Sequence, residues 1–271
     1  MRLRLVSKGT CFSSLRELAS ESKVAVVTGS SKGIGLATVR LLKEKGFVTI
    51  GVSRSGGGEA HEELRADVSS KEDVRRVVDY VVSKYGKIDV LVNNAGFGVY
   101  GYFWETPLDE EEYEVKTLLL GVIYFTKSVL PLMLRRNYGA IVNVVSEAAY
   151  VSMPTLLVYS SAKAAVAHFT NGLWASLKGT NVKVSGVYPG PVKTDFTSHP
   201  SFKNTEPKFN ILAVPPERVA KAVWKAIRTG KREIYVPSKL LIEPYFLKLA
   251  LSFQSLTYFV QRSIYGKKVI F

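Results

Sequence analysis

The sequence has few sulfur-containing residues and no long uninterrupted apolar run. Cys11 is the only cysteine among 271 residues, so no intramolecular disulfide can form, and a reducing compartment is the natural expectation. No apolar stretch approaches the roughly 18–20 residues of a transmembrane helix. Lys8, Arg16 and Glu17 interrupt the first residues, which therefore do not resemble the core of a signal peptide. We expect a cytoplasmic protein.

Acidic residues are scarce relative to basic ones. The chain has 37 Lys/Arg and 23 Asp/Glu, a formal net charge of +14. Residues 183–271 hold 15 Lys/Arg and 5 Asp/Glu, so +10 of this charge lies there and +4 in residues 1–182. No nucleic-acid-binding motif accompanies the excess, so it favours a phosphorylated cofactor or an anionic surface over nucleic acid. We also predict no metal site.

Short apolar runs and amphipathic helical patterns alternate from residue 23 to about residue 236. Strands are predicted at 24–27, 47–53, 88–93, 140–146 and 182–188, and helices from 34 onward and at 71–85, 111–135 and 159–177. Residues 59–66 leave room for only a truncated crossover helix. This alternation is typical of an α/β fold with a doubly wound parallel sheet and helices on both faces. The length and the 46% hydrophobic content suffice for a single domain.

The first strand leads into a glycine-rich turn, Thr28-Gly-Ser-Ser-Lys-Gly-Ile-Gly35. Gly29, Gly33 and Gly35 remove side chains where the backbone bends sharply and where a phosphate must approach the main chain. The following helix offers unpaired N–H groups and partial positive charge at its start, which suits a pyrophosphate. Taken alone, the pattern also fits a tight turn without a ligand.

Tyr159 and Lys163 form a second candidate site. Four residues apart on a helix, they share a face, and a fixed cation near a phenol lowers its pKa from about 10 toward the working pH. Ser146, at the end of the preceding strand, can reach the same edge of the sheet. On its own, a Tyr-x-x-x-Lys pattern is also typical of a solvated helix face.

Further motifs follow in order: Asp67-Val68, Asn93-Asn-Ala-Gly96, Ser146, Tyr159-Ser-Ser-Ala-Lys163 and Pro189-Gly-Pro-Val-Lys-Thr194. With the glycine turn, they cover residues 23 to about 236. In this set the chain resembles the short-chain dehydrogenase/reductase family. The resemblance implies a Rossmann-type oxidoreductase domain, placed at 23–238, between an N-terminal extension (1–22) and an apolar, basic C-terminal tail (239–271). It further implies hydride transfer between a nicotinamide C4 and a substrate carbon.

The resemblance also implies roles for individual residues. Tyr159 would exchange a proton with the substrate oxygen, Lys163 would also hold the nicotinamide ribose, and Ser146 would orient the substrate. Asn94 would steady the central strand, and Asp67 would meet the adenine. The implied cofactor contacts are Gly29, Ser31, Lys32, Gly33, Ile34, Gly35, Arg54, Asp67, Val68, Asn94, Ala95, Gly96, Tyr159, Lys163, Pro189, Gly190, Val192 and Thr194.

Charge at the end of the second strand predicts the cofactor. An acidic residue there would bind the ribose diol and repel a 2′-phosphate. The chain instead has Ser53-Arg54-Ser55, with Lys32 in the glycine turn, and these groups suit a 2′-phosphate. We predict NADP(H), although two solvated basic side chains would show the same pattern.

One position departs from the family pattern. The family places an asparagine three residues before a glycine on the long helix, whereas Leu118 precedes Gly121 here. Either the proton relay uses another group, or turnover is reduced. A non-catalytic NADP(H)-binding protein is therefore one alternative to an enzyme.

Aromatic and aliphatic residues at 97–104, at 150–156 and after Thr194 are predicted to line the substrate pocket. They favour a hydrophobic ketone, aldehyde or secondary alcohol. The tail is predicted to pack on the domain or in an interface of a homodimer or homotetramer. Peripheral membrane contact, as in a lipid- or steroid-type reductase, is the alternative.

Overall fold

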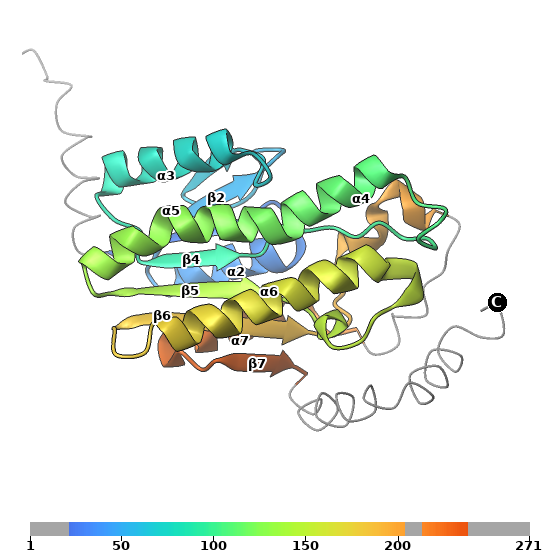
Figure 1. Cartoon of the computed structure of the whole chain (residues 1–271). Coiled ribbons are helices and arrows are strands. Elements are labelled where there is room, and N and C mark those ends of the chain that lie inside the picture. Colours follow the sequence, from blue (N-terminus) through green and yellow to red (C-terminus); the bar gives the residue numbers. More distant parts are fainter. Residues whose placement is uncertain (1–21, 204–212, 238–271) are drawn as a thin grey trace, which may run out of the picture.

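The computed structural model describes residues 22–203 and 213–237 (Figure 1). Within them a seven-stranded parallel sheet has the strand order β3-β2-β1-β4-β5-β6-β7, with helices on both faces. The predicted doubly wound α/β fold is confirmed. Cys11, the N-terminal extension and the tail from residue 238 lie outside the described residues, so the expectations for them stay predictions.

The strands are short and mostly buried. Because helices cover both faces, β1, β4 and β5 consist entirely of buried residues, as expected for the centre of a parallel sheet. Val26 of β1 pairs with Ile50 of β2 on one side and with Leu91 of β4 on the other. The strands are β1 (Val24–Thr28), β2 (Val48–Ser53), β3 (Glu62–Arg65), β4 (Val90–Asn93), β5 (Gly139–Val144), β6 (Val182–Pro189) and β7 (Glu233–Val236).

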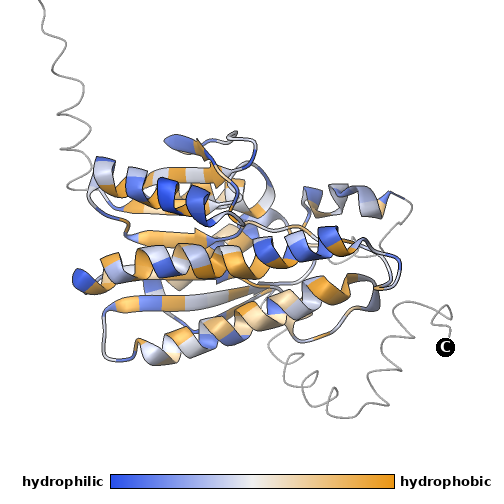
Figure 2. Cartoon of the chain, turned by 45° about the horizontal axis from the view of Figure 1, so that its top comes forward, coloured by the Kyte–Doolittle hydropathy of each residue, from blue (hydrophilic) through white to orange (hydrophobic). Residues whose placement is uncertain are grey.

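Two apolar layers hold the helices on the sheet. Alternate residues of β1 point to opposite faces, so Val24 and Val26 pack with α3 and α5, whereas Ala25 and Val27 pack with α2 and α7. Figure 2 shows the apolar surfaces of the helices turned toward the strands. The helices are α2 (Gly33–Glu44), α3 (Lys71–Tyr85), α4 (Leu108–Val115), α5 (Gly121–Arg135), α6 (Leu157–Ser176) and α7 (Pro216–Thr229).

The long helix predicted at 111–135 is interrupted. A π-helical turn, η1 (Lys116–Leu120), joins α4 to α5. Such a turn inserts an extra residue per turn and changes which side chains face the core. Leu118 in this turn is buried, and a Cβ placed on Gly96 would lie 2.7 Å from its Cδ2 atom. The turn therefore wedges an apolar side chain against the end of β4.

The run Leu108–Arg135 also corrects the expectation about apolar stretches. By length and composition it is apolar enough to cross a membrane. However, Phe125, Val129 and Met133 are buried against the sheet. Its hydropathy is that of a core helix.

The predicted truncated helix between β2 and β3 is wrong. The connection consists of bends, and Glu62–Arg65 is a strand. Gly56 and Gly58 adopt φ values of 68° and 157°, which break helical geometry. The Glu63 carboxylate organises the connection instead, since it accepts hydrogen bonds from the Ala60 N–H (2.8 Å) and the Ser30 hydroxyl (3.0 Å).

Candidate active site

A large cavity of about 1370 Å³ lies at the carboxyl ends of the strands, where parallel α/β sheets bind ligands. The structure brings nearly all of the predicted site residues to its wall. Gly35 is the exception. The predicted residues that line the cavity are Gly29, Ser31, Lys32, Gly33, Ile34, Arg54, Asp67, Val68, Asn94, Ala95, Gly96, Ser146, Tyr159, Lys163, Pro189, Gly190, Val192 and Thr194.

Gly35 acts in packing rather than as part of the wall. A Cβ on Gly35 would lie 2.0 Å from the Gly29 carbonyl oxygen, so only glycine fits there. Gly29 has a φ of 66°, and its own Cβ would lie 2.8 Å from the Ala95 Cα. The Asn94 side chain donates to the carbonyls of Thr28 (2.9 Å) and Gly29 (3.2 Å). It thus ties β4 to β1, which agrees with the steadying role predicted for it.

The start of α2 fits a pyrophosphate. Lys32 precedes the helix and makes no side-chain hydrogen bond to the first turn. The first N–H groups of α2 therefore lack a capping side chain, and Ser31, Gly33 and Ile34 face the cavity. Unpaired N–H groups at a helix start are the donors that bind phosphate oxygens. The residues present fit a dinucleotide.

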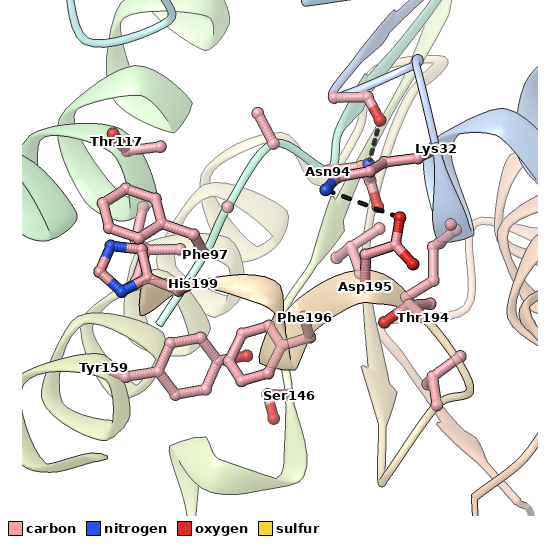
Figure 3. Close-up of a pocket in the computed structure, with 18 of the residues that line it drawn as sticks. Lys32, Asn94, Phe97, Thr117, Ser146, Tyr159, Thr194, Asp195, Phe196 and His199 are labelled. Carbon is pink, nitrogen blue, oxygen red and sulfur yellow. Dashed lines mark hydrogen bonds and ion pairs between the residues drawn. The ribbon is translucent and has the colours of Figure 1, made fainter. Parts of the chain in front are cut away.

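Ser146, Tyr159 and Lys163 all line the cavity, and Figure 3 shows Ser146 and Tyr159. Ser146 follows β5 and accepts a hydrogen bond from the Ala148 N–H (3.1 Å), and its hydroxyl interacts with that of Tyr159. Lys163, one turn after Tyr159 on α6, donates to the Val144 carbonyl (2.9 Å). Its Nζ lies 5.7 Å from the centre of the Tyr159 ring.

The charge states of these groups differ from the sequence-based expectation. Burial raises the pKa of Tyr159 to about 12, and the hydrogen bond to Ser146 only partly offsets this rise. Burial lowers the pKa of Lys163 to about 8. Desolvation outweighs the attraction between phenolate and ammonium that the helix spacing suggested. At neutral pH, Tyr159 is therefore protonated and able to donate a proton.

The two predicted phosphate-binding cations are paired within the protein. Lys32 lies 3.6 Å from Asp195, and both side chains are more than half exposed. Arg54 donates to the Tyr113 hydroxyl (3.1 Å), which donates to Asp67 (2.6 Å). Although burial opposes it, hydrogen bonds from Tyr113 and Ser69 hold the pKa of Asp67 below its usual range. Tyr113 therefore links the end of β2 to the predicted adenine contact.

Apolar and aromatic residues also line the cavity, as predicted. Val151, Met153, Leu156 and Phe196 do so, next to the polar residues Asp195, Thr197 and Ser198. Phe196 lies edge-on to Tyr159 with ring centres 5.2 Å apart, and His199 stacks on Phe97 at 5.5 Å (Figure 3).

The predicted aromatic lining at 97–104 is only partly correct. Phe97 lines the cavity, but Phe103 and Trp104 are exposed. Tyr150 packs against Tyr188 and Tyr235 instead of lining the cavity. Spacing alone does not show which aromatic side chains of a loop turn inward.

Sequence reasoning missed Tyr113, Glu114, Thr117 and His199. Glu114 is completely buried on α4, and Thr117 lines the cavity. One signal was available, because Glu111, Glu114 and Leu118 recur at helical spacing on the face whose neighbours are apolar. Acidic residues on such a face indicate buried charges.

A doubly wound sheet whose glycine turn and Tyr-x-x-x-Lys helix meet in one cavity defines a dinucleotide-binding oxidoreductase. Residues 23–204 match the short chain dehydrogenase family. The chain belongs to the short-chain dehydrogenase/reductase family, as the sequence motifs predicted.

Solved structures show the same fold. A short-chain dehydrogenase/reductase from Burkholderia phymatum in complex with NAD has a TM-score of 0.76 at 24% identity, covering 86% of this chain and 95% of that one. A point variant of the actinorhodin polyketide ketoreductase with NADPH has a TM-score of 0.70 at 31% identity, covering 80% and 96%. A nicotinamide cofactor is therefore supported, whereas these neighbours do not decide between its two forms.

A curated relative points to ketone chemistry. The 3-ketodihydrosphingosine reductase of Bacteroides thetaiotaomicron is 32% identical over 181 residues, which cover 66% of this chain and 67% of the relative. The chain is thus an oxidoreductase with ketoreductases among its relatives.

Proposed function

We propose that this protein reduces an apolar ketone or aldehyde to the alcohol with NADPH, using Tyr159 as the proton donor. The observation that carries the proposal is the Tyr159 hydroxyl beside Ser146, on the wall of a cavity that apolar residues also line. A donor must keep its proton until the substrate oxygen becomes basic, and a raised pKa ensures this at neutral pH.

The residues divide the reaction between them. Ser146 orients the substrate carbonyl, and the Tyr159 proton passes to the carbonyl oxygen as negative charge develops there. The nicotinamide, when bound, would supply the hydride that the carbonyl carbon takes up, so the C=O double bond becomes a C–O single bond while a C–H and an O–H bond form. The buried Lys163 ammonium stabilises the phenolate left on Tyr159. Run in reverse, the same groups would oxidise a secondary alcohol.

NADPH is favoured over NADH by the charges at the end of β2. Arg54 lines the cavity there, and Lys32 lies in the glycine turn. Glu63, on the adjacent strand, is engaged by Ser30 and Ala60 and is not part of the cavity wall. Arg54 and Lys32 both offer positive charge to a 2′-phosphate, and no carboxylate ends β2 itself.

The apolar wall supports a hydrophobic substrate. Phe97, Met153, Leu156 and Phe196 line the cavity, and the ring of Phe196 lies edge-on to that of Tyr159. Apolar pockets with a few convergent polar groups bind small apolar ligands in a fixed orientation. The named ketone substrate of the Bacteroides relative and the polyketide ketoreductase neighbour agree with a ketone.

A non-catalytic NADPH-binding protein is the second candidate. The observation that favours it is Leu118, buried where the family pattern has an asparagine. An apolar side chain there cannot carry a proton toward Lys163.

Replacing Tyr159 separates the two functions. With NADPH and a panel of apolar ketones and aldehydes, Tyr159→Phe is expected to lower kcat/KM by at least about 100-fold, because general acid catalysis contributes roughly 10²–10⁴-fold. NADPH fluorescence should show cofactor binding unchanged. Tyr138→Phe, at an exposed tyrosine outside the cavity wall, is the matched control and should behave as wild type.

Two results would contradict the proposed reaction. Equal turnover by Tyr159→Phe and wild type would exclude Tyr159 as the donor. NADPH binding by the wild type without turnover of any carbonyl on the panel would favour the non-catalytic binding protein.

A further inference from the structure

Glu114 is a fully buried carboxylate to which the reaction above gives no role. It lies on α4, which packs against the catalytic helix α6. Its Oε1 accepts a hydrogen bond from the Val99 N–H (3.0 Å), while Oε2 has no hydrogen-bond partner among the described residues. A buried carboxylate oxygen without a partner is costly, so its retention calls for an explanation.

Lys163 is a buried cation that needs a negative partner. Its ammonium is buried and donates to the Val144 carbonyl, but the space over Gly96 is filled by Leu118. A Cβ on Gly96 would lie 2.7 Å from the Leu118 Cδ2 and 4.0 Å from the Lys163 Nζ. One flank of the ammonium is therefore apolar, and a buried cation needs a counter-charge.

Glu114 is a candidate for that counter-charge. It lies one helical turn before Leu118, and its field acts on both Lys163 and Tyr159. The charged groups that act on Glu114 itself are Glu111 on α4 and Lys163 on α6. Glu111 accepts a hydrogen bond from the Thr106 hydroxyl and is also buried.

From this packing we infer that Glu114 is a positioning residue for Lys163, holding its ammonium charged and fixed beside Tyr159. The inference rests on the proposed function, since it assigns to Glu114 the support of the lysine that stabilises the Tyr159 phenolate. It also gives a reason why Leu118 is tolerated, because the polar support comes from the preceding helical turn.

Loss of the Glu114 charge should move the pH profile of activity in one direction. Burial raises the pKa of Glu114 to about 7, so its charge is present above neutral pH, where the pKa of Lys163 is about 8. Without this negative charge, desolvation acts on Lys163 unopposed and its pKa falls. The pKa of Tyr159 falls too, because Glu114 contributes to its rise. Whether Lys163 or Tyr159 limits activity at high pH, the alkaline limb of the kcat/KM profile should therefore move to lower pH.

Glu114→Gln tests this with the full-length protein. Glutamine keeps the shape and can still accept the Val99 N–H, but it carries no charge. We expect the alkaline limb of kcat/KM for carbonyl reduction to move down by about one pH unit, within the range of effects of nearby charges. The dissociation constant of NADPH should begin to rise at a lower pH in Glu114→Gln than in the wild type. Fluorescence titration from about pH 6 to 9.5 spans the shifted range.

Glu111→Gln is the matched control. It removes a buried carboxylate one turn earlier that acts on Glu114 but not on Lys163, so its alkaline limb should coincide with that of the wild type. Glu114→Asp keeps the negative charge, so its alkaline limb should lie between those of Glu114→Gln and the wild type. If Glu114→Gln does not fold, Glu114→Met provides a second uncharged variant, and thermal unfolding verifies the fold of each.

A pH profile of Glu114→Gln that is parallel to the wild type, even at reduced kcat, would overturn the inference and leave Glu114 a packing residue. A shift shared equally by Glu111→Gln would also overturn it. The NADPH-binding arm needs no turnover. A protein that binds NADPH but reduces no carbonyl would refute the proposed reaction, while the binding profile would still decide the role of Glu114.

Discussion

At the scale of single residues, burial decides the chemistry more than residue type does. Tyr159 and Lys163 have the spacing of an activated tyrosine, yet enclosure raises the pKa of the phenol and lowers that of the amine. Both shifts favour the uncharged forms, as desolvation requires. The raised pKa of Tyr159 supports the proposal that this residue donates the proton.

We propose that the choice of cofactor depends on Arg54. Arg54→Gln should weaken NADPH binding by at least about tenfold, since hydrogen bonds to charged groups are worth about 1.5–3 kcal/mol. NADH binding should hardly change, because NADH lacks the 2′-phosphate. Fluorescence titration with both cofactors measures the difference.

Arg65→Gln provides the control for charge alone. Arg65 ends the neighbouring strand β3 and is exposed, but it does not line the cavity. Its loss should leave the preference between the cofactors unchanged. An equal loss of NADH and NADPH affinity in Arg54→Gln would mean that Arg54 supports the site through Tyr113 rather than through the phosphate.

At the scale of elements, the segment after β6 closes the substrate side. The 3₁₀ turns η4 (Asp195–Ser198) and η5 (Pro200–Phe202) carry Phe196 and His199 onto the cavity wall. Phe196 contacts Tyr159, and a Cβ on Gly98 would lie 2.5 Å from its ring. The ring is thus held between two elements close to the proton donor.

Removing this ring should weaken substrate binding more than cofactor binding. Phe196→Ala is expected to raise KM for an apolar ketone by about tenfold, since the substrate would cover this partly buried ring and fully burying such a side chain contributes roughly 1.5–3 kcal/mol. Steady-state kinetics measure KM, and fluorescence should show NADPH binding near wild type. Trp104→Ala, at an exposed aromatic residue, is the control. An unchanged KM in Phe196→Ala would show that substrates do not contact this ring.

The sequence predicted those elements whose pattern is local. Helix α3 was predicted with its observed bounds, because its valines repeat at helical spacing and Gly86 ends it in a left-handed conformation. The π turn at Lys116–Leu120 was not predicted, since it depends on how Leu118 packs against β4.

The same distinction holds for the candidate site. Its predicted members carry recognisable chemistry at strand ends, where topology brings them together. Glu114 could not be assigned in that way, because its importance comes from burial next to another helix. Strand β3 was missed for a similar reason, as Glu63 supports it through contacts with Ser30 and Ala60.

At the scale of the whole molecule, buried and surface carboxylates give opposite dependences of stability on pH. Hydrogen bonds to Tyr85, Tyr80 and Lys84 keep the pKa of Glu62 below its usual range, despite partial burial, and Asp67 is likewise depressed. Depressed carboxylates stabilise the fold above their unfolded pKa values, and this stability is lost as the pH falls through their folded values.

The raised pKa of Glu114 makes the fold less stable as the pH rises. Its pKa rises from 4.5 to about 7 on folding, so the folded protein holds an extra proton between these values. Its contribution is fully present below pH 4.5 and is lost as the pH rises through about 7. One pKa unit corresponds to about 1.36 kcal/mol, so the loss reaches about 3 kcal/mol.

The free energy of unfolding without cofactor should therefore be highest near about pH 4.5, and it should fall from there to about pH 7. Urea unfolding across about pH 4–8 measures this. Glu114→Gln should lack the decrease between about pH 4.5 and 7, because its side chain does not titrate, while both proteins should lose stability below about pH 4 as Glu62 and Asp67 protonate. A wild-type protein that is most stable near about pH 8 would show that the Glu114 carboxyl ionises in the folded state without this cost.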